Sequence, residues 1–294
     1  MHSSISSTEK KDRGSDRGVV FAIKVVAAFF LILALYCVLL RIVPKSDDGP
    51  GLYNTNVLKA QRYVRENGDF DAVLVGSSMG SVMPIADHSE RYFNLAFSGE
   101  NSLSGMEIIE RCGEETGHYP EVVFVEISDA LESGVDKDLL GRTKGLGIAW
   151  FNRIENRPDY LFYSLAKAIY YQNTEEKATD YAVMEDKLAY WVNAKSNAAD
   201  QEEMEAYIAL AKEHVDMLKE KGCRVILLEI PNHQELHDLT ESVQLRETAL
   251  RFMPEDSYEW YREDWSDYVM SDAIHMGERS AKIYTEKLVE KYLR

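Results

Sequence analysis

Four short apolar runs, separated by segments with helical patterns, constrain the fold of this chain more than any other feature. The runs occupy residues 72–75, 92–96, 122–127 and 225–230. They are apolar at most positions instead of at every second one, which is typical of strands buried on both faces. Helices between such strands cover the two faces of a mostly parallel sheet. The sequence therefore predicts a single α/β domain.

Helical spacing of apolar residues fills most of the intervals between these runs. A glycine at position 222, after a basic residue at 219, marks the end of the helix before the fourth run. Residues 131–197 are rich in aromatic side chains without a strand pattern, and we expect helical excursions there. The predicted helices cover residues 57–66, 103–112, 204–218, 234–252 and 279–293.

Residues 19–40 predict a membrane span, because they are apolar except for Lys24 and contain neither proline nor glycine. A helix of this length rises roughly 33 Å, which is enough to cross a hydrocarbon core of about 30 Å. A cleaved signal peptide is the alternative, but the small residues that signal peptidase requires do not follow the run. Tyr36 also occupies the position before Cys37 where a lipoprotein signal needs a small residue. We expect an uncleaved signal anchor over residues 19–43.

Basic residues indicate the orientation of this anchor. Five lysines and arginines precede the span or lie at its start, and two follow it closely. This excess favours a cytoplasmic N-terminus, so the prediction is a single-pass protein of the cell membrane with its C-terminal domain outside. Residues 1–18 are predicted to be a disordered cytoplasmic tail, residues 44–53 a polar linker, and residues 54–294 the α/β domain.

Charge and composition exclude several classes of function. The chain has a net charge of −17, and the part beyond residue 45 holds 26 basic and 47 acidic residues, a net charge of −21. Such a domain repels nucleic acid, so we expect no nucleic-acid partner. The histidines lack the spacing of metal ligands, and we predict no metal and no cofactor. Cys112 and Cys223 either form a disulfide or remain two buried thiols.

Two motifs at opposite ends of the predicted domain contain residues that hydrolytic chemistry needs. Residues 76–80 read Gly-Ser-Ser-Met-Gly directly after the first strand, which matches a Gly-x-Ser-x-Gly turn centred on Ser78. Asp272 and His275 lie three residues apart before the last helix. Each motif alone is explained by a capping residue in a loop. Together they supply a nucleophile, a base and a carboxylate that orients the base.

The order of these motifs resembles the SGNH, or GDSL-like, hydrolase superfamily over residues 71–294. The resemblance implies a flavodoxin-like three-layer domain, with Ser78 as nucleophile, His275 as base and Asp272 as its orienting group. Members often have aspartate where this chain has Ser77. The chain also resembles membrane-anchored relatives that act in teichoic-acid D-alanylation and polysaccharide O-acetylation.

The resemblance further implies an oxyanion hole. The turn after the second strand matches the second block of the family, so the backbone N–H groups of Ser78 and Gly99 would bind the oxyanion. The third block departs from the family pattern, because Asp129 stands where an asparagine is expected. An ionised carboxylate cannot donate a hydrogen bond. Asn101 or Ser128 is the candidate replacement.

Other polar residues are candidates for contacting the substrate, since parallel sheets bind ligands at the carboxyl ends of their strands. Aromatic residues 258–265 either complete the core or form a sugar-stacking wall near the site. The candidate substrate-lining residues are Ser77, Asn101, Asp129, Asn232 and His233.

The sequence predicts a serine esterase or O-acyltransferase that acts on acyl groups of a cell-envelope glycan or glycolipid. One helix would hold it in the lipid bilayer. The alternative is a non-catalytic SGNH-fold subunit that binds or assembles an envelope-modifying complex, with a membrane-bound acyltransferase as the candidate partner.

Overall fold

The sheet is parallel and has five strands. The computed structural model describes residues 12–127, 134–173, 185–196 and 199–294. The strand order is β2-β1-β3-β4-β5, and each neighbouring pair is parallel. The chain passes from β1 to β2 on one side and then crosses back to β3 on the other side of β1. The topological switch point therefore lies between β1 and β3. The strands are β1 (Ala72–Val75), β2 (Tyr92–Asn94), β3 (Val122–Glu126), β4 (Arg224–Leu228) and β5 (Glu259–Tyr261).

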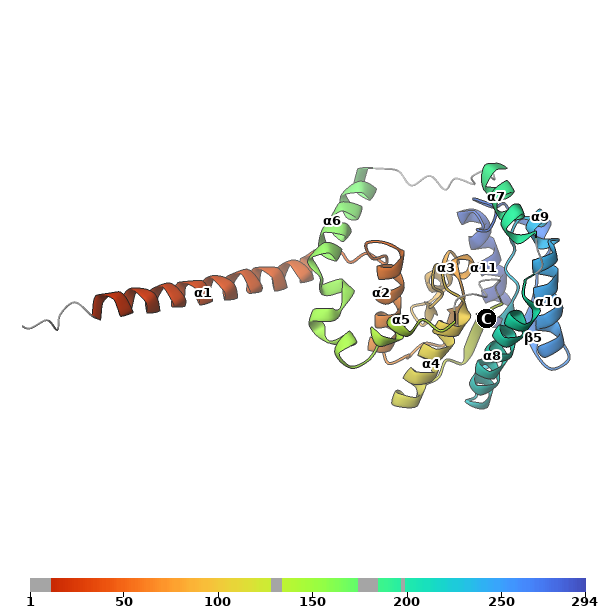
Figure 1. Ribbon diagram of the computed structural model, residues 1–294, viewed down its shortest axis with the longest axis horizontal. Coiled ribbons are helices and arrows are strands. Elements are labelled where there is room, and N and C mark those ends of the chain that lie inside the picture. Colours follow the sequence, from red (N-terminus) through yellow and green to blue (C-terminus); the bar gives the residue numbers. More distant parts are fainter. Residues whose placement is uncertain (1–11, 128–133, 174–184, 197–198) are drawn as a thin grey trace, which may run out of the picture.

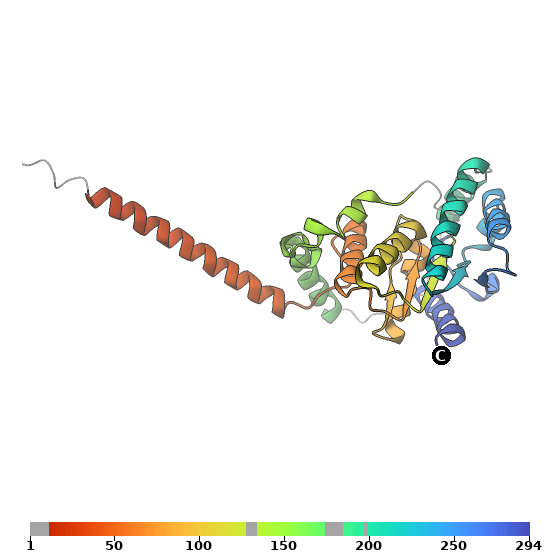
Figure 2. The same cartoon turned by 90° about the horizontal axis from the view of Figure 1, so that it is seen from below.

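Helices cover both faces of this sheet, as the prediction of a three-layer α/β domain requires (Figures 1 and 2). One face is covered by α2 (Leu52–Arg65), α4 (Ser102–Thr116), α8 (Gln201–Glu220) and α10 (Thr240–Phe252). The other is covered by α11 (Glu278–Tyr292), together with the short α3 (Ser78–Ser81) and η1 (Ile85–His88). The remaining elements are α5 (Lys137–Gly141), η2 (Gly145–Ile148), η3 (Trp150–Asn152), η4 (Ile154–Asn156), α6 (Pro158–Asn173), α7 (Glu185–Lys195), α9 (Gln234–His237) and η5 (Trp265–Asp267).

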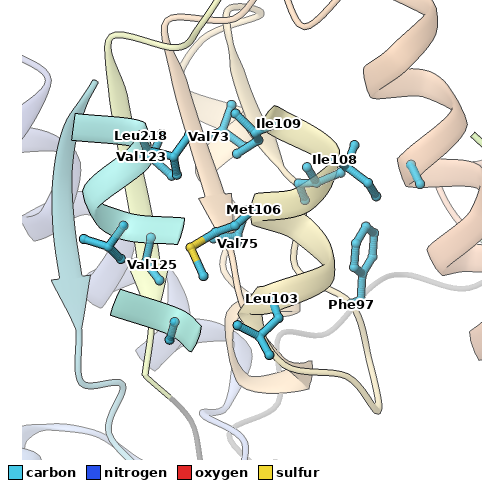
Figure 3. Close-up of a cluster of buried hydrophobic side chains, with 14 of the residues drawn as sticks. Val73, Val75, Phe97, Leu103, Met106, Ile108, Ile109, Val123, Val125 and Leu218 are labelled. Carbon is cyan, nitrogen blue, oxygen red and sulfur yellow. The ribbon is translucent and has the colours of Figure 1, made fainter. Parts of the chain in front are cut away.

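Strand β1 shows why its sequence is apolar throughout. Val73 and Val75 belong to the buried cluster that contains Leu103 and Met106 of α4 (Figure 3). The alternate residues of β1 belong to the cluster on the other face, against α11. All four residues of the strand are buried. Both sets of side chains stabilise the folded protein by being removed from water. Polar side chains are therefore disfavoured on either face of this strand.

One prediction for the C-terminal half needed correction, and one alternative left open there is decided. Residues 234–252 are not one helix, because Leu239 is extended and separates α9 from α10. Residues 259–261 form the edge strand β5, in which the aromatic Tyr261 is buried and the aromatic Trp260 packs on the core. Three residues are too few for a strand pattern to emerge from sequence. These aromatic side chains complete the core.

Both buried cysteines are thiols in the structure. Cys112 lies in α4 and Cys223 directly precedes β4, and neither forms a disulfide. Burial raises the pKa of each thiol to about 11, so both stay protonated and unreactive near neutral pH.

The N-terminal helix α1 (Asp12–Ile42) extends away from the domain (Figure 1). Residues 18–42 are long and apolar enough to cross a membrane, and none of the most apolar window is buried in the protein. Residues 12–18 of the predicted disordered tail are helical, since adding residues to an existing helix costs little. Residues 1–11 lie outside the described part of the chain.

The segment predicted as a linker is bonded to the domain. Tyr160 Oη of α6 donates to the carbonyl of Ser46 at 2.6 Å, and Arg62 of α2 donates to the same oxygen at 2.7 Å. Lys167 of α6 pairs with Asp48. Helix α2 begins at Leu52, within this segment. The end of α1 is therefore held against α2 and α6.

Candidate active site

Strand β1 places Ser78 at the carboxyl edge of the sheet, beside the switch point. Ser77 caps α3, with its hydroxyl accepting the backbone N–H of Met79 at 3.2 Å. The flanking glycines do not adopt a positive φ. A Cβ at Gly76 or Gly80 would instead overlap the side chain of Glu126. The two glycines are needed because a carboxylate lies directly beneath the turn.

That carboxylate is the main feature of the site that the sequence did not indicate. Glu126 ends β3 and is fully buried. Its oxygens accept the backbone N–H of Ser77 at 2.9 Å, the hydroxyl of Ser77 at 2.6 Å and the backbone N–H of Gly80 at 3.0 Å. Position 77 is therefore a serine that bonds to a carboxylate from the neighbouring strand.

Ser78, His275 and Asp272 form one hydrogen-bonded chain. His275 Nε2 lies 2.8 Å from Ser78 Oγ, and its Nδ1 lies 2.9 Å from Asp272 Oδ2. Asp272 Oδ1 also accepts the backbone N–H groups of Ile274 and His275, at 2.9 and 2.8 Å. The same carboxylate thus closes the turn and orients the ring.

The electrostatics of Asp272 suit this arrangement. Partial burial by itself would raise the pKa of Asp272, but the hydrogen bonds from the backbone and ring of His275 outweigh it and keep that pKa below its usual range. The carboxylate is therefore ionised near neutral pH. An ionised partner favours the tautomer with the proton on Nδ1, which leaves Nε2 free to accept the proton of Ser78.

Backbone contacts hold the loop that contains Asp272 and His275. The N–H of His233, after β4, donates to the carbonyl of Ala273 at 3.0 Å. An isolated bridge pairs Met270 with Met276 across the base of the loop. The last strand-to-helix connection is thereby fixed to the end of β4, two positions along the sheet from β1.

The predicted substrate-lining residues have different positions in the structure. Ser77 is buried beneath the turn, and Asn101 is fully buried, where its side chain caps α4 through the N–H of Leu103. The His233 ring caps α9 by accepting the N–H of Glu235 at 3.3 Å. Asn232 lines a cleft next to Met79. Asp129, with Ser128, lies outside the described residues.

The turn that contains Gly99 is held by helix α2. Gly99 has a φ of 80°, a left-handed conformation that favours glycine. Asn56 binds both backbone groups of Ser98, accepting its N–H at 3.1 Å and donating to its carbonyl at 3.0 Å. Lys59 Nζ donates to the carbonyl of Ala96 at 3.0 Å. Sequence inspection missed both α2 residues, because they precede this turn by about 40 positions. The oxyanion role of Gly99 and Ser78 stays a prediction.

Replacing Lys59 by methionine is expected to stabilise the protein near neutral pH. Burial lowers the pKa of Lys59 to about 8, and nearby Asp48 only partly opposes this. In the unfolded chain the pKa is about 10.4, so the charged form is disfavoured in the folded state. The penalty is complete below pH 8 and disappears as the pH rises through about 10.4.

Denaturant unfolding of both proteins between pH 6.5 and 10.5 tests this. The pKa difference allows a gain of up to about 3 kcal/mol at the acid end, reduced by about 1 kcal/mol for the lost hydrogen bond to Ala96. A difference in unfolding free energy that stays constant across this range would contradict the assignment.

A cleft opens beside α3 at the carboxyl edge. Among the described residues, the buried side-chain oxygens of Asn232 and Ser242 have no hydrogen-bond partner. Glu229 lies deeper and is mostly buried, which raises its pKa despite the nearby Arg246. The cleft is lined by Met79, Ile127, Glu229, Ile230, Asn232, Ser242, Leu245, Arg246 and Trp265.

Among the residues that the structure describes, one cluster of potential metal ligands lies between α4 and α8. Ligand atoms of Glu107, Glu110 and His214 lie within 4.8 Å of one another. His214 Nδ1 is 2.5 Å from Glu110. Desolvation would lower the pKa of His214, but Glu110 raises it overall, which favours an ion pair between the two helices. The absence of a metal from the protein stays a prediction.

The fold and the site together define a parallel α/β protein with a Ser–His–Asp chain at the carboxyl edge of its sheet. No family model matches the sequence, and no curated protein matches it. Among solved structures it is similar to a Bacteroides fragilis protein provisionally named an acylhydrolase, at 10% identity and a TM-score of 0.39, covering 80% of this chain and 97% of that one. A GDSL-like lipase from Bacteroides thetaiotaomicron is also similar, at 10% identity and a TM-score of 0.37, covering 79% and 99%. Because these similarities are low, the function has to be inferred from the geometry of the site itself.

Proposed function

We propose that this protein is a membrane-anchored serine esterase or O-acyltransferase. The observation that supports it is the continuous hydrogen-bonded chain from Ser78 Oγ through His275 to Asp272, at the switch point of a parallel sheet. A capping role explains the bonds from Asp272 to the backbone N–H groups of Ile274 and His275, but it does not require the contact between His275 Nε2 and Ser78 Oγ. The chain has the connectivity that nucleophilic acyl transfer requires.

The reaction follows from this connectivity. Ser78 Oγ attacks the acyl carbon while its proton passes to His275 Nε2, and ionised Asp272 stabilises the imidazolium. The alcohol then leaves with that proton as the acyl-serine forms. Water or a sugar hydroxyl, deprotonated by His275, releases the acyl group. The N–H groups of Ser78 and Gly99 would bind the oxyanion in both steps.

An acylated glycan or glycolipid of the cell envelope is the substrate class that we propose, with the domain outside the membrane. The apolar helix α1 supports this class, because tethering raises the local concentration of a substrate held at the same surface. The cleft beside α3 is lined by Asn232 and Ser242, whose side-chain oxygens have no hydrogen-bond partner among the described residues, and a polar lining of this kind suits a hydroxyl-rich ligand.

Labelling with a fluorophosphonate tests the nucleophile. We expect the purified full-length protein to be labelled and to hydrolyse a simple acetyl ester, whereas Ser78→Ala does neither. Ser266→Ala, which removes an exposed hydroxyl, is the matched control and should react normally. Labelling that survives in Ser78→Ala but is lost in Ser77→Ala would show that Ser77, and not Ser78, is the nucleophile. If the wild-type protein is inert in both assays, the non-catalytic binding or assembly role is favoured.

A further inference from the structure

One part of the domain exposes an unusual number of large apolar side chains. Phe162 is 74% exposed, Leu146 is 77% exposed and Phe151 is 65% exposed. Soluble surfaces seldom gather such residues, and a cluster of them marks an interaction site. We refer to this cluster as the α6 surface; it consists of Leu146, Trp150, Phe151, Phe162, Leu165, Ile169 and Tyr170.

Helix α6 presents its apolar stripe outward. Phe162, Leu165 and Ile169 follow one another at intervals of three and four residues, so they lie on one side of the helix, and all three are exposed. Tyr160 and Ser164 are buried on another side, where Tyr160 bonds to the segment that follows α1. The helix is thus fixed to the domain by one side, and its apolar side is exposed among the described residues.

The position of this helix relative to α1 indicates what covers it. Tyr36 Oη, six residues before the end of α1, donates to the carbonyl of Asn156 in η4. Six residues correspond to about 9 Å along a helix axis. If α1 spans a bilayer, η4 and the start of α6 lie level with its last turns, where hydrocarbon gives way to headgroups.

The direction of α6 fits the same location. Figure 1 shows α6 beside the C-terminal end of α1, and in that view α6 runs across the direction of α1 rather than along it. A helix that crosses a membrane-spanning helix at its end lies along the membrane surface. Lys45 pairs with Glu155 of η4 and Lys167 of α6 pairs with Asp48, which holds this arrangement on both sides of the connection.

Charge around the α6 surface differs from that of the whole domain. Residues 141–170 contain five basic and two acidic residues, although the chain has a net charge of −17. Arg142 and Lys144 are exposed next to Leu146. Aromatic side chains with neighbouring basic residues are typical of helices that lie in the interface of an anionic bilayer.

We propose that the α6 surface lies in the headgroup region of the bilayer that α1 enters, as a second membrane contact. This contact would fix the orientation of the domain, so that Ser78 faces the membrane-held substrate at a constant height. The inference rests on the proposed membrane span. A lipid surface is favoured over a protein partner because the hydrogen bond from Tyr36 sets η4 at the depth of the interface.

Fluorescence quenching in vesicles tests this contact with the full-length protein. In a Cys37→Ser background the other two cysteines are buried, so an environment-sensitive dye can be attached to single new cysteines. The positions are Phe162→Cys and Ile169→Cys on the α6 surface, Phe30→Cys in the span and Leu210→Cys on α8 as the control. With nitroxide-labelled lipid in anionic vesicles, we expect the dye to lose most of its fluorescence at 162, 169 and 30, and little at 210.

The outcomes separate this inference from the proposed function. Quenching at 30 without quenching at 162 and 169 overturns the membrane contact and leaves the span intact. Absence of quenching at 30 removes the span, while the fluorophosphonate assay still reports on the active serine. A blue shift at 162 that needs added membrane proteins would overturn the lipid contact in favour of a protein partner.

A variant with two introduced charges on the α6 surface provides a second test. Phe162→Glu with Ile169→Glu should abolish quenching of a dye at Leu165→Cys, whereas Val269→Glu, at an exposed site elsewhere, should not. Retained fluorophosphonate labelling shows that each variant is folded. Unchanged quenching in the charged variant would contradict a membrane location for α6.

Discussion

Replacing Ser78 by alanine is expected to lower kcat/KM for an acetyl ester by a factor of about 10⁶. The hydroxyl is the group that His275 Nε2 contacts at 2.8 Å, and no covalent intermediate can form without it. His275→Ala should have a loss of similar size. Because a nucleophile and its base act as a unit, the double variant should lose little more than either single variant. Steady-state kinetics of the full-length proteins measure all three.

Asp272→Asn is the informative companion to this series. Its side-chain oxygen can still accept the N–H groups of Ile274 and His275, so we expect the loop and the melting temperature to be preserved. Its amide would face Nδ1 and favour the wrong ring tautomer, which costs about 10⁴ in kcat. If Asp272→Asn or Ser78→Ala retained wild-type activity, the triad would not be the catalytic machinery.

The sequence was sufficient to predict the parts of the site that follow directly from strand ends. An apolar run of four residues followed by Gly-Ser-Ser places Ser78 at the carboxyl edge, and the structure gives β1 the same bounds. Asp272 and His275 could be predicted because they lie three residues apart and directly before the last helix, and both features can be read from the sequence. The contact of His275 with Ser78, across 197 positions, depends on the order of the strands.

Residues that act from other elements could not be identified in this way. Glu126 stands out only as a charge at the end of an apolar run, and nothing local shows that it points under the turn instead of into solvent. Asn56 and Lys59 belong to an ordinary helical pattern. Their contacts with residues 96–98 arise only once α2 packs beside β2 and α4.

Helix α6 shows a different limit of sequence analysis. Its helical character was predicted, yet a helical stripe of apolar residues predicts only that the stripe is covered by something. In the structure Tyr160 and Ser164 occupy the inner side, and the stripe of Phe162, Leu165 and Ile169 faces outward beside the end of α1.

Replacing Glu126 by leucine is expected to have the largest effect on stability. Its carboxylate is fully buried, and the donors that it accepts include the backbone N–H groups of Ser77 and Gly80 and the Ser77 hydroxyl. Leucine would leave these donors buried without acceptors, at about 1–3 kcal/mol each. That sum is comparable to the roughly 5–15 kcal/mol that stabilises a whole domain. Denaturant unfolding or thermal melting of Glu126→Leu should show a severely destabilised protein.

Glu126→Gln separates stability from positioning. Glutamine keeps one acceptor oxygen but turns an amide toward the remaining donors, so we expect a folded protein whose α3 is held less tightly. A displacement of Ser78 by about 1 Å would lower kcat by a factor of about 10². Because Glu126 lies beneath the turn, away from the open side of Ser78, KM should change little. If Glu126 only stabilised the fold, we would expect the opposite pattern: a lower melting temperature, with a normal kcat for the molecules that remain folded. The split between kcat and KM therefore decides whether Glu126 positions the nucleophile.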